Sequence, residues 1–265
     1  KRAAMKRLVN VFLRGAADGL SILAPVGDAA YRAARPTQAL SDAVVLDVGI
    51  EGFGLHPGAP RLAELVRSRA VAMVPAAGYE GQPRSHFQSQ ALRESSVGGA
   101  SEAGGSSGGA GWIGAMLAVG STKVVRPFRG VAVGAVSVPQ SLRGTGDALG
   151  APALDALRLG ALAPRRGGFA VRESPVTPKR AAIEETWARR GAAPEVAGEG
   201  ARAAVEVLER LGGSSVDLGD VTPFGEGETA EAFAAASALL DSDLGTEVVQ
   251  IDLGGWDTHQ SQGTA

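Results

Sequence analysis

The sequence has no cysteine, no excess of charge of one sign and no long apolar run. Without cysteine there are no disulfides, no thiolate metal sites and no cysteine nucleophile, although the compartment stays open. A net charge of -2 offers no basic face to nucleic acid or to an acidic membrane. No segment approaches the roughly 20 apolar residues that span a bilayer. These absences favour a globular protein that acts on a small molecule.

The residues that are present are enough for a sizeable core. The chain has 265 residues, of which 45% are hydrophobic, so it can form one large domain or two small ones. Only three histidines occur, and each therefore needs an explanation. His56 precedes a proline in a loop, which indicates a structural role. His86 follows Ser85, and His259 lies beside a carboxylate in the segment GGWDTHQSQ, residues 254–262.

Strand and helix patterns alternate along the chain. Short apolar or β-branched runs predict buried strands at residues 7–15, 70–78, 129–139 and 246–255. Helical spacing, with proline or N-cap signals, predicts helices at residues 27–35, 60–69, 86–95 and 111–118, and a helical cluster at about 177–245. The region from 143 to 160 reads as an irregular connection. Residues 95–111 are almost all Gly, Ser and Ala, which predicts a flexible surface loop.

This alternation predicts an α/β fold with a mostly parallel sheet, in which ligands bind beyond the carboxyl ends of the strands. Asp18 follows the first predicted strand, Ser85 follows the second, and Asp257 and His259 follow the last. We therefore expect these four groups to converge. If residues 257–259 are extended, Asp257 and His259 share one face, where an oxygen and a nitrogen can bind the same cation.

Ser85 stands at the start of a predicted helix, where unpaired N–H groups and the helix dipole attract an anion such as a phosphoryl or sulfuryl group. Arg14 and Arg84 can add positive charge there. With a divalent metal lowering the pKa of its hydroxyl, Ser85 is a candidate nucleophile. His86 is a candidate substrate-binding residue beside it.

Each assignment has a plainer alternative. Asp18 precedes a glycine and can simply stabilise a turn. Ser85 can serve as an N-cap, which is compatible with a nucleophilic role. His86 can be a partly exposed residue of the first helical turn. Asp257 and His259 can form a hydrogen-bonded turn without metal.

The segments NVFLRGAADGLSILAP, GFGLHP, PRSHFQSQ, GWIGAMLA and GGWDTHQSQ, in this order, resemble a large bacterial domain-of-unknown-function family within the alkaline phosphatase and sulfatase superfamily. The resemblance implies an alkaline-phosphatase-like three-layer α/β/α sandwich. It matches Ser85 to the nucleophile, and Asp18, Asp257 and His259 to metal ligands. Zinc is the expected metal, with calcium, manganese or magnesium as alternatives. Family members are commonly exported by the twin-arginine route, which implies a periplasmic or secreted protein.

The resemblance also implies residues that this sequence lacks. Family members continue into an Asp-His-Gly motif and a further His, whereas this chain ends at Ala265. We therefore expect the N-terminal part of a longer single domain, or a truncated protein with an incomplete metal site. No signal peptide is recognised; because the sequence starts at Lys1 rather than Met, a leader that was cut away or left out is compatible with it.

Two functions follow as expectations. The first is a metal-dependent hydrolase of phosphate esters, or less readily sulfate esters, because without cysteine the formylglycine of most sulfatases cannot form. The second is a non-catalytic exported binding or scaffold protein that keeps the fold without a complete metal site. The sequence leaves the substrate and the oligomeric state open.

Overall fold

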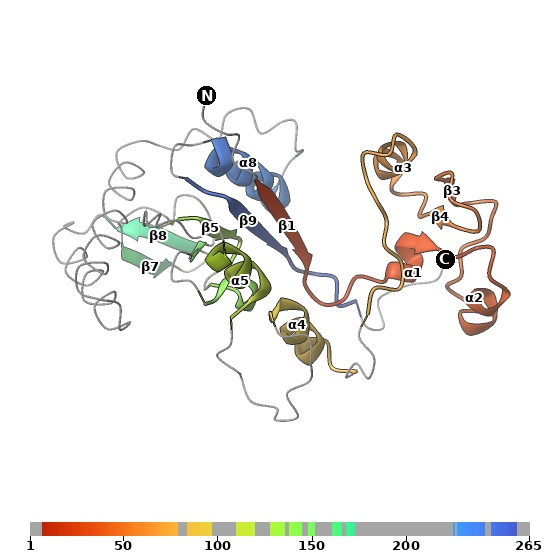
Figure 1. The fold of residues 1–265 in the computed structure, drawn as a ribbon, viewed down its shortest axis with the longest axis horizontal. Coiled ribbons are helices and arrows are strands. Elements are labelled where there is room, and N and C mark those ends of the chain that lie inside the picture. Colours follow the sequence, from red (N-terminus) through yellow and green to blue (C-terminus); the bar gives the residue numbers. More distant parts are fainter. Residues whose placement is uncertain are drawn as a thin grey trace. The chain divides into compact units, whose positions relative to one another are not determined.

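The computed structural model in Figure 1 describes residues 7–78, 84–96, 110–119, 128–135, 138–144, 148–151, 161–165, 168–172, 225, 227–241 and 245–258. The chain divides into two compact units. Unit 1 comprises Lys1–Phe12 and Phe87–Leu253, and unit 2 comprises Leu13–His86 and Gly254–Ala265. The prediction of one domain that continues past Ala265 stays a prediction.

Unit 1 is built on a four-stranded sheet with the order β1-β9-β5-β6 (Figure 1). Its central strand β5 (Gly130–Val133) runs parallel to both of its neighbours, β9 (Val248–Leu253) and β6 (Ala148–Ala151). The register pairs Gly130 with Val248 on one side and with Ala148 on the other. The edge strand β1 (Leu8–Leu13) lies beside β9, and Leu8 N donates to Glu247 O over 2.9 Å.

Helices pack on both faces of this sheet, because alternate residues of each strand point to opposite sides. Val131, Val133 and Ile251 pack with the alanine-rich helix α8 (Glu228–Asp241). Ala132 and Val248 instead pack with α5 (Trp112–Val119) and the short 3₁₀ helix η1 (Gln140–Leu142). Both faces are therefore buried, as expected for a parallel sheet.

The rest of unit 1 includes α4 (His86–Glu94), whose first residue belongs to unit 2, and an antiparallel pair, β7 (Ala161–Arg165) with β8 (Gly168–Arg172). Ser95 forms an isolated bridge with Gly111. The two ends of the predicted flexible loop therefore meet, while its residues 97–109 lie outside the described residues. The same holds for the predicted helices between residues 177 and 224; α8 confirms the last helix of that cluster.

The described residues of unit 2 form three helices and a small antiparallel sheet. The helices are α1 (Gly19–Ile22), α2 (Ala29–Ala34) and α3 (Pro60–Arg67), and the sheet has the order β2-β4-β3, formed by Leu23–Ala24, Gly54–Leu55 and Leu46–Asp47. Asp28 caps α2 by accepting from Ala30 N at 2.8 Å, and Pro60 opens α3. Leu55 and Val66 belong to the core that α3 buries against this sheet.

Three sequence expectations need correction. Residues 70–78 do not form a strand, because the end of α3 folds back and the N–H groups of Ala70 and Val71 both donate to Leu65 O. Residues 148–151, expected to be irregular, form β6. The strand β1 is present but is not buried, since Val9 and Val11 on the sheet edge are 41% and 39% exposed.

Unit 1 is thus a mixed α/β structure with a parallel three-stranded sheet and helices, which confirms the predicted fold class in its coarse form. No helix in the described part of the chain is long and apolar enough to cross a membrane.

Candidate functional site

Unit 2 brings together three segments that are far apart in the sequence. These are residues 14–18, which follow β1, residues 84–86, which lead into α4, and residues 254–258, which follow β9. Trp256 N donates to Arg14 O over 3.3 Å, so the first and last segments lie side by side. His86 reaches the last segment through its contact with Asp257.

Gly15 lies directly against Asp257. Its φ of 102° lies in the left-handed region, which glycine adopts readily. A Cβ built on Gly15 would lie 2.5 Å from Asp257 N and 2.6 Å from Asp257 Cβ. Only a residue without a side chain therefore allows Asp257 to sit at this place.

Asp257 pairs with His86. Its Oδ2 lies 3.2 Å from His86 Nε2, and the two side chains are 34% and 27% exposed. The partner expected for Asp257 was His259, which lies outside the described residues, so that pairing stays a prediction. His86 was predicted to bind substrate, and the structure shows that the carboxylate of Asp257 lies beside it.

Ser85 directly precedes α4, as expected for a residue at a helix start, and its side chain is half-buried. Arg14 is half-buried and Arg84 is exposed. Arg84, Ser85 and His86 are consecutive, so all three belong to the segment that meets Asp257. The roles predicted for Arg14, Arg84 and Ser85 stay predictions.

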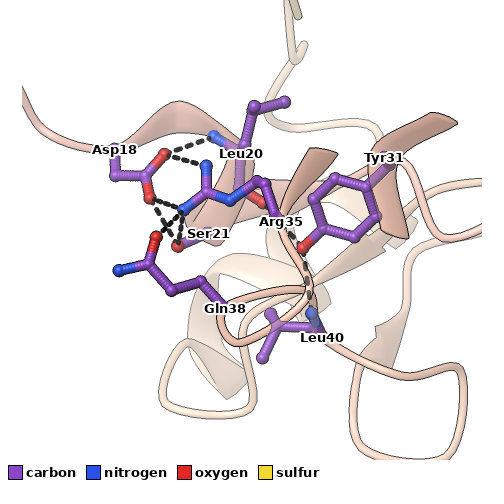
Figure 2. Close-up of polar contacts among 7 residues, drawn as sticks. All are labelled: Asp18, Leu20, Ser21, Tyr31, Arg35, Gln38 and Leu40. Carbon is purple, nitrogen blue, oxygen red and sulfur yellow. Dashed lines mark hydrogen bonds and ion pairs between the residues drawn. The ribbon is translucent and has the colours of Figure 1, made fainter. Parts of the chain in front are cut away.

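Asp18 is held by four donors, as Figure 2 shows. Its Oδ1 accepts from Leu20 N at 3.1 Å and from Arg35 Nη1 at 2.9 Å, while Oδ2 accepts from Ser21 Oγ at 2.7 Å and from Arg35 Nη2. Arg35 also donates to Gln38 Oε1 at 3.2 Å. The hydrogen bonds from Arg35 lower the pKa of Asp18 to about 2, and partial burial opposes this shift.

Asp18 therefore acts as the N-cap of α1 and as one half of a bidentate ion pair. This is the turn-stabilising alternative that its Asp-Gly sequence offered. A cation that bound Asp18 would have to displace Arg35, which already neutralises the carboxylate. Asp18 nevertheless remains near the site. It follows Gly15 by only three residues, so the two Cα atoms lie within about 11 Å of each other.

Arg35 was not among the residues predicted to belong to the site. It stands at the end of α2 immediately before Pro36, and its pairing with Asp18 spans 17 residues. Pro36 marks the end of the helix, but nothing in the local pattern indicates what the arginine at that end contacts.

Within the described residues, no group of three or more histidine, aspartate and glutamate side chains is placed to hold a metal ion. His86 and Asp257 place one imidazole nitrogen and one carboxylate oxygen, two donor types that metals accept, side by side. Comparisons with protein-family models, with curated proteins and with solved structures find no match for this chain. The class that the fold defines is accordingly a mixed α/β protein.

Proposed function

We propose that the protein is a metal-dependent hydrolase of phosphate esters, or less readily of sulfate esters, with an alkaline-phosphatase-like three-layer sandwich fold. The observation that carries this proposal is the meeting, in unit 2, of the segments that follow β1 and β9 with the segment that opens α4. The candidate nucleophile thus adjoins the described carboxylate and imidazole pair. The resemblance described above supplies the reaction class, and export to the periplasm or beyond belongs to the same proposal.

Ser85 is the proposed nucleophile. Its position before α4 suits a phosphoryl group, because the first N–H groups of the helix and its dipole favour an anion. The Ser85 Oγ–P bond forms as the ester P–O bond breaks, and the alcohol leaves with a proton. Water then cleaves the phosphoserine and releases inorganic phosphate. A bound divalent cation, zinc before manganese, magnesium or calcium, supplies charge stabilisation and a lowered hydroxyl pKa.

The arginines of the site bind and orient the ester. Arg14 lies on the segment against Trp256, and Arg84 precedes the nucleophile. Guanidinium groups favour phosphate because their planar N–H donors can form paired hydrogen bonds with its oxygens.

The test is hydrolysis of an aryl phosphate and an aryl sulfate by the purified chain, with and without added zinc, manganese, magnesium or calcium. We expect metal-dependent hydrolysis that Ser85→Ala lowers at least about 100-fold, since the covalent route is lost. Ser68→Ala is the matched control, because Ser68 lies at the end of α3 and its hydroxyl donates to Leu65 O. Equal activity of Ser85→Ala and the wild type would remove the mechanism.

The second candidate is a non-catalytic exported binding or scaffold protein. The pairing of Asp18 with Arg35 favours it, because one expected metal ligand already has a cationic partner inside the protein. Metal analysis of the purified chain separates the two candidates. A protein that holds no stoichiometric metal, and cannot be loaded with it, supports the binding or scaffold function.

A further inference from the structure

We propose that His86 is a metal ligand, and that His86 Nε2 and Asp257 Oδ2 bind the same divalent ion; this rests on the proposed function, whose ligand set it changes. The sequence predicts that His86 binds substrate. The structure instead puts its Nε2 3.2 Å from Asp257 Oδ2, within unit 2.

The separation of the two donor atoms suits a shared ion. Bonds of about 2.0–2.2 Å from zinc to nitrogen and oxygen, at angles from about 90° to about 110°, put neighbouring ligand atoms about 2.8–3.6 Å apart. The observed 3.2 Å falls inside this interval. Both side chains are about one-third exposed, so water or substrate can reach the remaining positions of such an ion.

The chemistry of the two donor atoms limits which metal ions suit the site. A neutral imidazole with a carboxylate suits zinc, cobalt or manganese, whereas calcium and magnesium prefer oxygen ligands throughout. Both oxygens of Asp18 accept from Arg35, so a metal ion would have to displace the guanidinium there. The imidazole of His86, which lies beside Asp257, can donate a lone pair to a metal ion when it is neutral.

Gly15 is the positioning residue for this pair. Asp257 lies where a Cβ of residue 15 would be, so the backbone of the first segment fixes the carboxylate opposite His86. Gly49 provides a comparison, since it also has a positive φ, of 70°, but has no atom within 4 Å of its would-be Cβ.

The experiment is a titration of the full chain with Co²⁺, in which visible absorption monitors binding. Metal analysis after dialysis then measures how much cobalt stays bound. We expect the wild type to bind cobalt, and His86→Gln to bind at least about tenfold more weakly with altered absorption bands, because one nitrogen ligand is lost. His56→Gln is the control. His56 lies in the same unit, where its Nδ1 accepts from Gly58 N at 3.0 Å, and it should bind cobalt as the wild type does.

Gly15→Ala and Gly49→Ala give a second, independent test of the metal site. Both carry the cost of alanine at positive φ, but only Gly15→Ala displaces Asp257. We expect weaker cobalt binding in Gly15→Ala alone. Circular dichroism identifies any glycine variant that does not fold. If Gly15→Ala does not fold, the cobalt titration of His86→Gln decides whether the proposal stands.

An unchanged titration and spectrum in His86→Gln would overturn the proposal, and so would a folded wild type that binds no cobalt. A plain hydrogen bond between His86 and Asp257 predicts that unchanged titration. Ester hydrolysis assayed in parallel keeps the two proposals apart. Cobalt binding that needs His86 without any hydrolysis refutes only the proposed reaction, while metal-dependent hydrolysis with full metal affinity in His86→Gln refutes only the ligand.

Discussion

Among single residues, Asp18 and Arg35 form a partly buried ion pair. Both side chains are largely shielded from solvent, at 25% and 15% exposed, and the carboxylate also caps α1. Hydrogen bonding from Arg35 is the largest cause of the lowered pKa of Asp18, and in turn the pairing raises the pKa of Arg35. The pair joins the start of α1 to the end of α2 and so fixes the chain directly after residues 14–15.

This pair predicts a stability that depends on pH. Because the pKa of Asp18 falls from 3.8 to about 2 on folding, its contribution is complete above pH 4 and disappears as the pH falls through 2. Asp18→Asn keeps an oxygen that can accept from Leu20 N but loses the ion pair. We expect it to lower the free energy of unfolding at pH 7 by about 1–2 kcal/mol, after allowance for partial exposure.

Urea unfolding monitored by circular dichroism at pH 7, 4 and 3 measures this loss. The difference between the wild type and Asp18→Asn should shrink toward pH 3, and a difference that stays constant would contradict the assignment. Glu64→Gln is the control, because the Arg61–Glu64 pair on α3 is 90% and 55% exposed and should contribute less than about 0.5 kcal/mol.

At the scale of elements, the Arg129–Glu247 pair joins three parts of unit 1. Arg129 precedes β5 and Glu247 precedes β9, and Arg129 Nε and Nη2 each donate to one Glu247 oxygen at 3.0 Å. Arg129 Nη1 also donates to Leu117 O in α5 at 2.7 Å. The guanidinium is almost completely buried. It therefore fixes the starts of two parallel strands against the helix that covers them.

Glu247→Gln should destabilise unit 1 by about 3 kcal/mol, because it leaves a buried guanidinium without its counter-charge. Thermal or urea unfolding followed by circular dichroism measures the loss. The exposed pair Arg7–Asp241 gives the matched control, and Asp241→Asn should cost less than about 1 kcal/mol. Equal effects of the two variants would show that burial does not decide the contribution of these ion pairs.

At the scale of the whole molecule, each buried hydrophobic cluster of the described residues draws its members from one unit only. Unit 1 contains the clusters around Ile251 and around Leu117, one on each face of its sheet. Unit 2 contains the clusters around Leu55 and around Tyr31. Burial of apolar surface supplies most of the driving force for folding, so each unit has a core of its own.

Cavity-forming substitutions should therefore act within one unit. Leu55→Ala and Ile251→Ala each remove a fully buried side chain and should cost about 2–5 kcal/mol in the unit concerned. Native-state hydrogen exchange should show faster exchange near Leu23 and Val48 for Leu55→Ala, and in β5 and β9 for Ile251→Ala. Equal acceleration of both sets of amides by either variant would indicate one cooperative unit instead.

Local sequence signals predicted half of the described elements, and these are mostly the longer helices and strands. The Asp cap and Pro36 define α2, Pro60 opens α3, and β-branched or apolar runs define β5 and β9. Each of these signals acts within a few residues, through capping hydrogen bonds, a missing N–H group or side-chain stiffness. A short sequence therefore carries enough information to specify them.

Signals of the same kind failed where a distant segment decides the conformation. The sequence Ala148–Ala151 has no β-branched residue and becomes a strand because β5 supplies its hydrogen-bond partners. Residues 70–78 read as a strand, but two of their N–H groups are taken by the end of α3. Propensity is a weak influence beside such contacts.

The residues available for chemistry follow from the sequence alone: a serine before a helix, scarce histidines, and no thiol. The order of strands and polar residues also predicted that the segments after β1 and β9 meet, and the hydrogen bond from Trp256 N to Arg14 O confirms this. The partners of these side chains follow from the fold, because a side chain pairs with whatever the fold brings within about 3 Å. Asp18 thus meets Arg35, and Asp257 meets His86 above a glycine that leaves room for it.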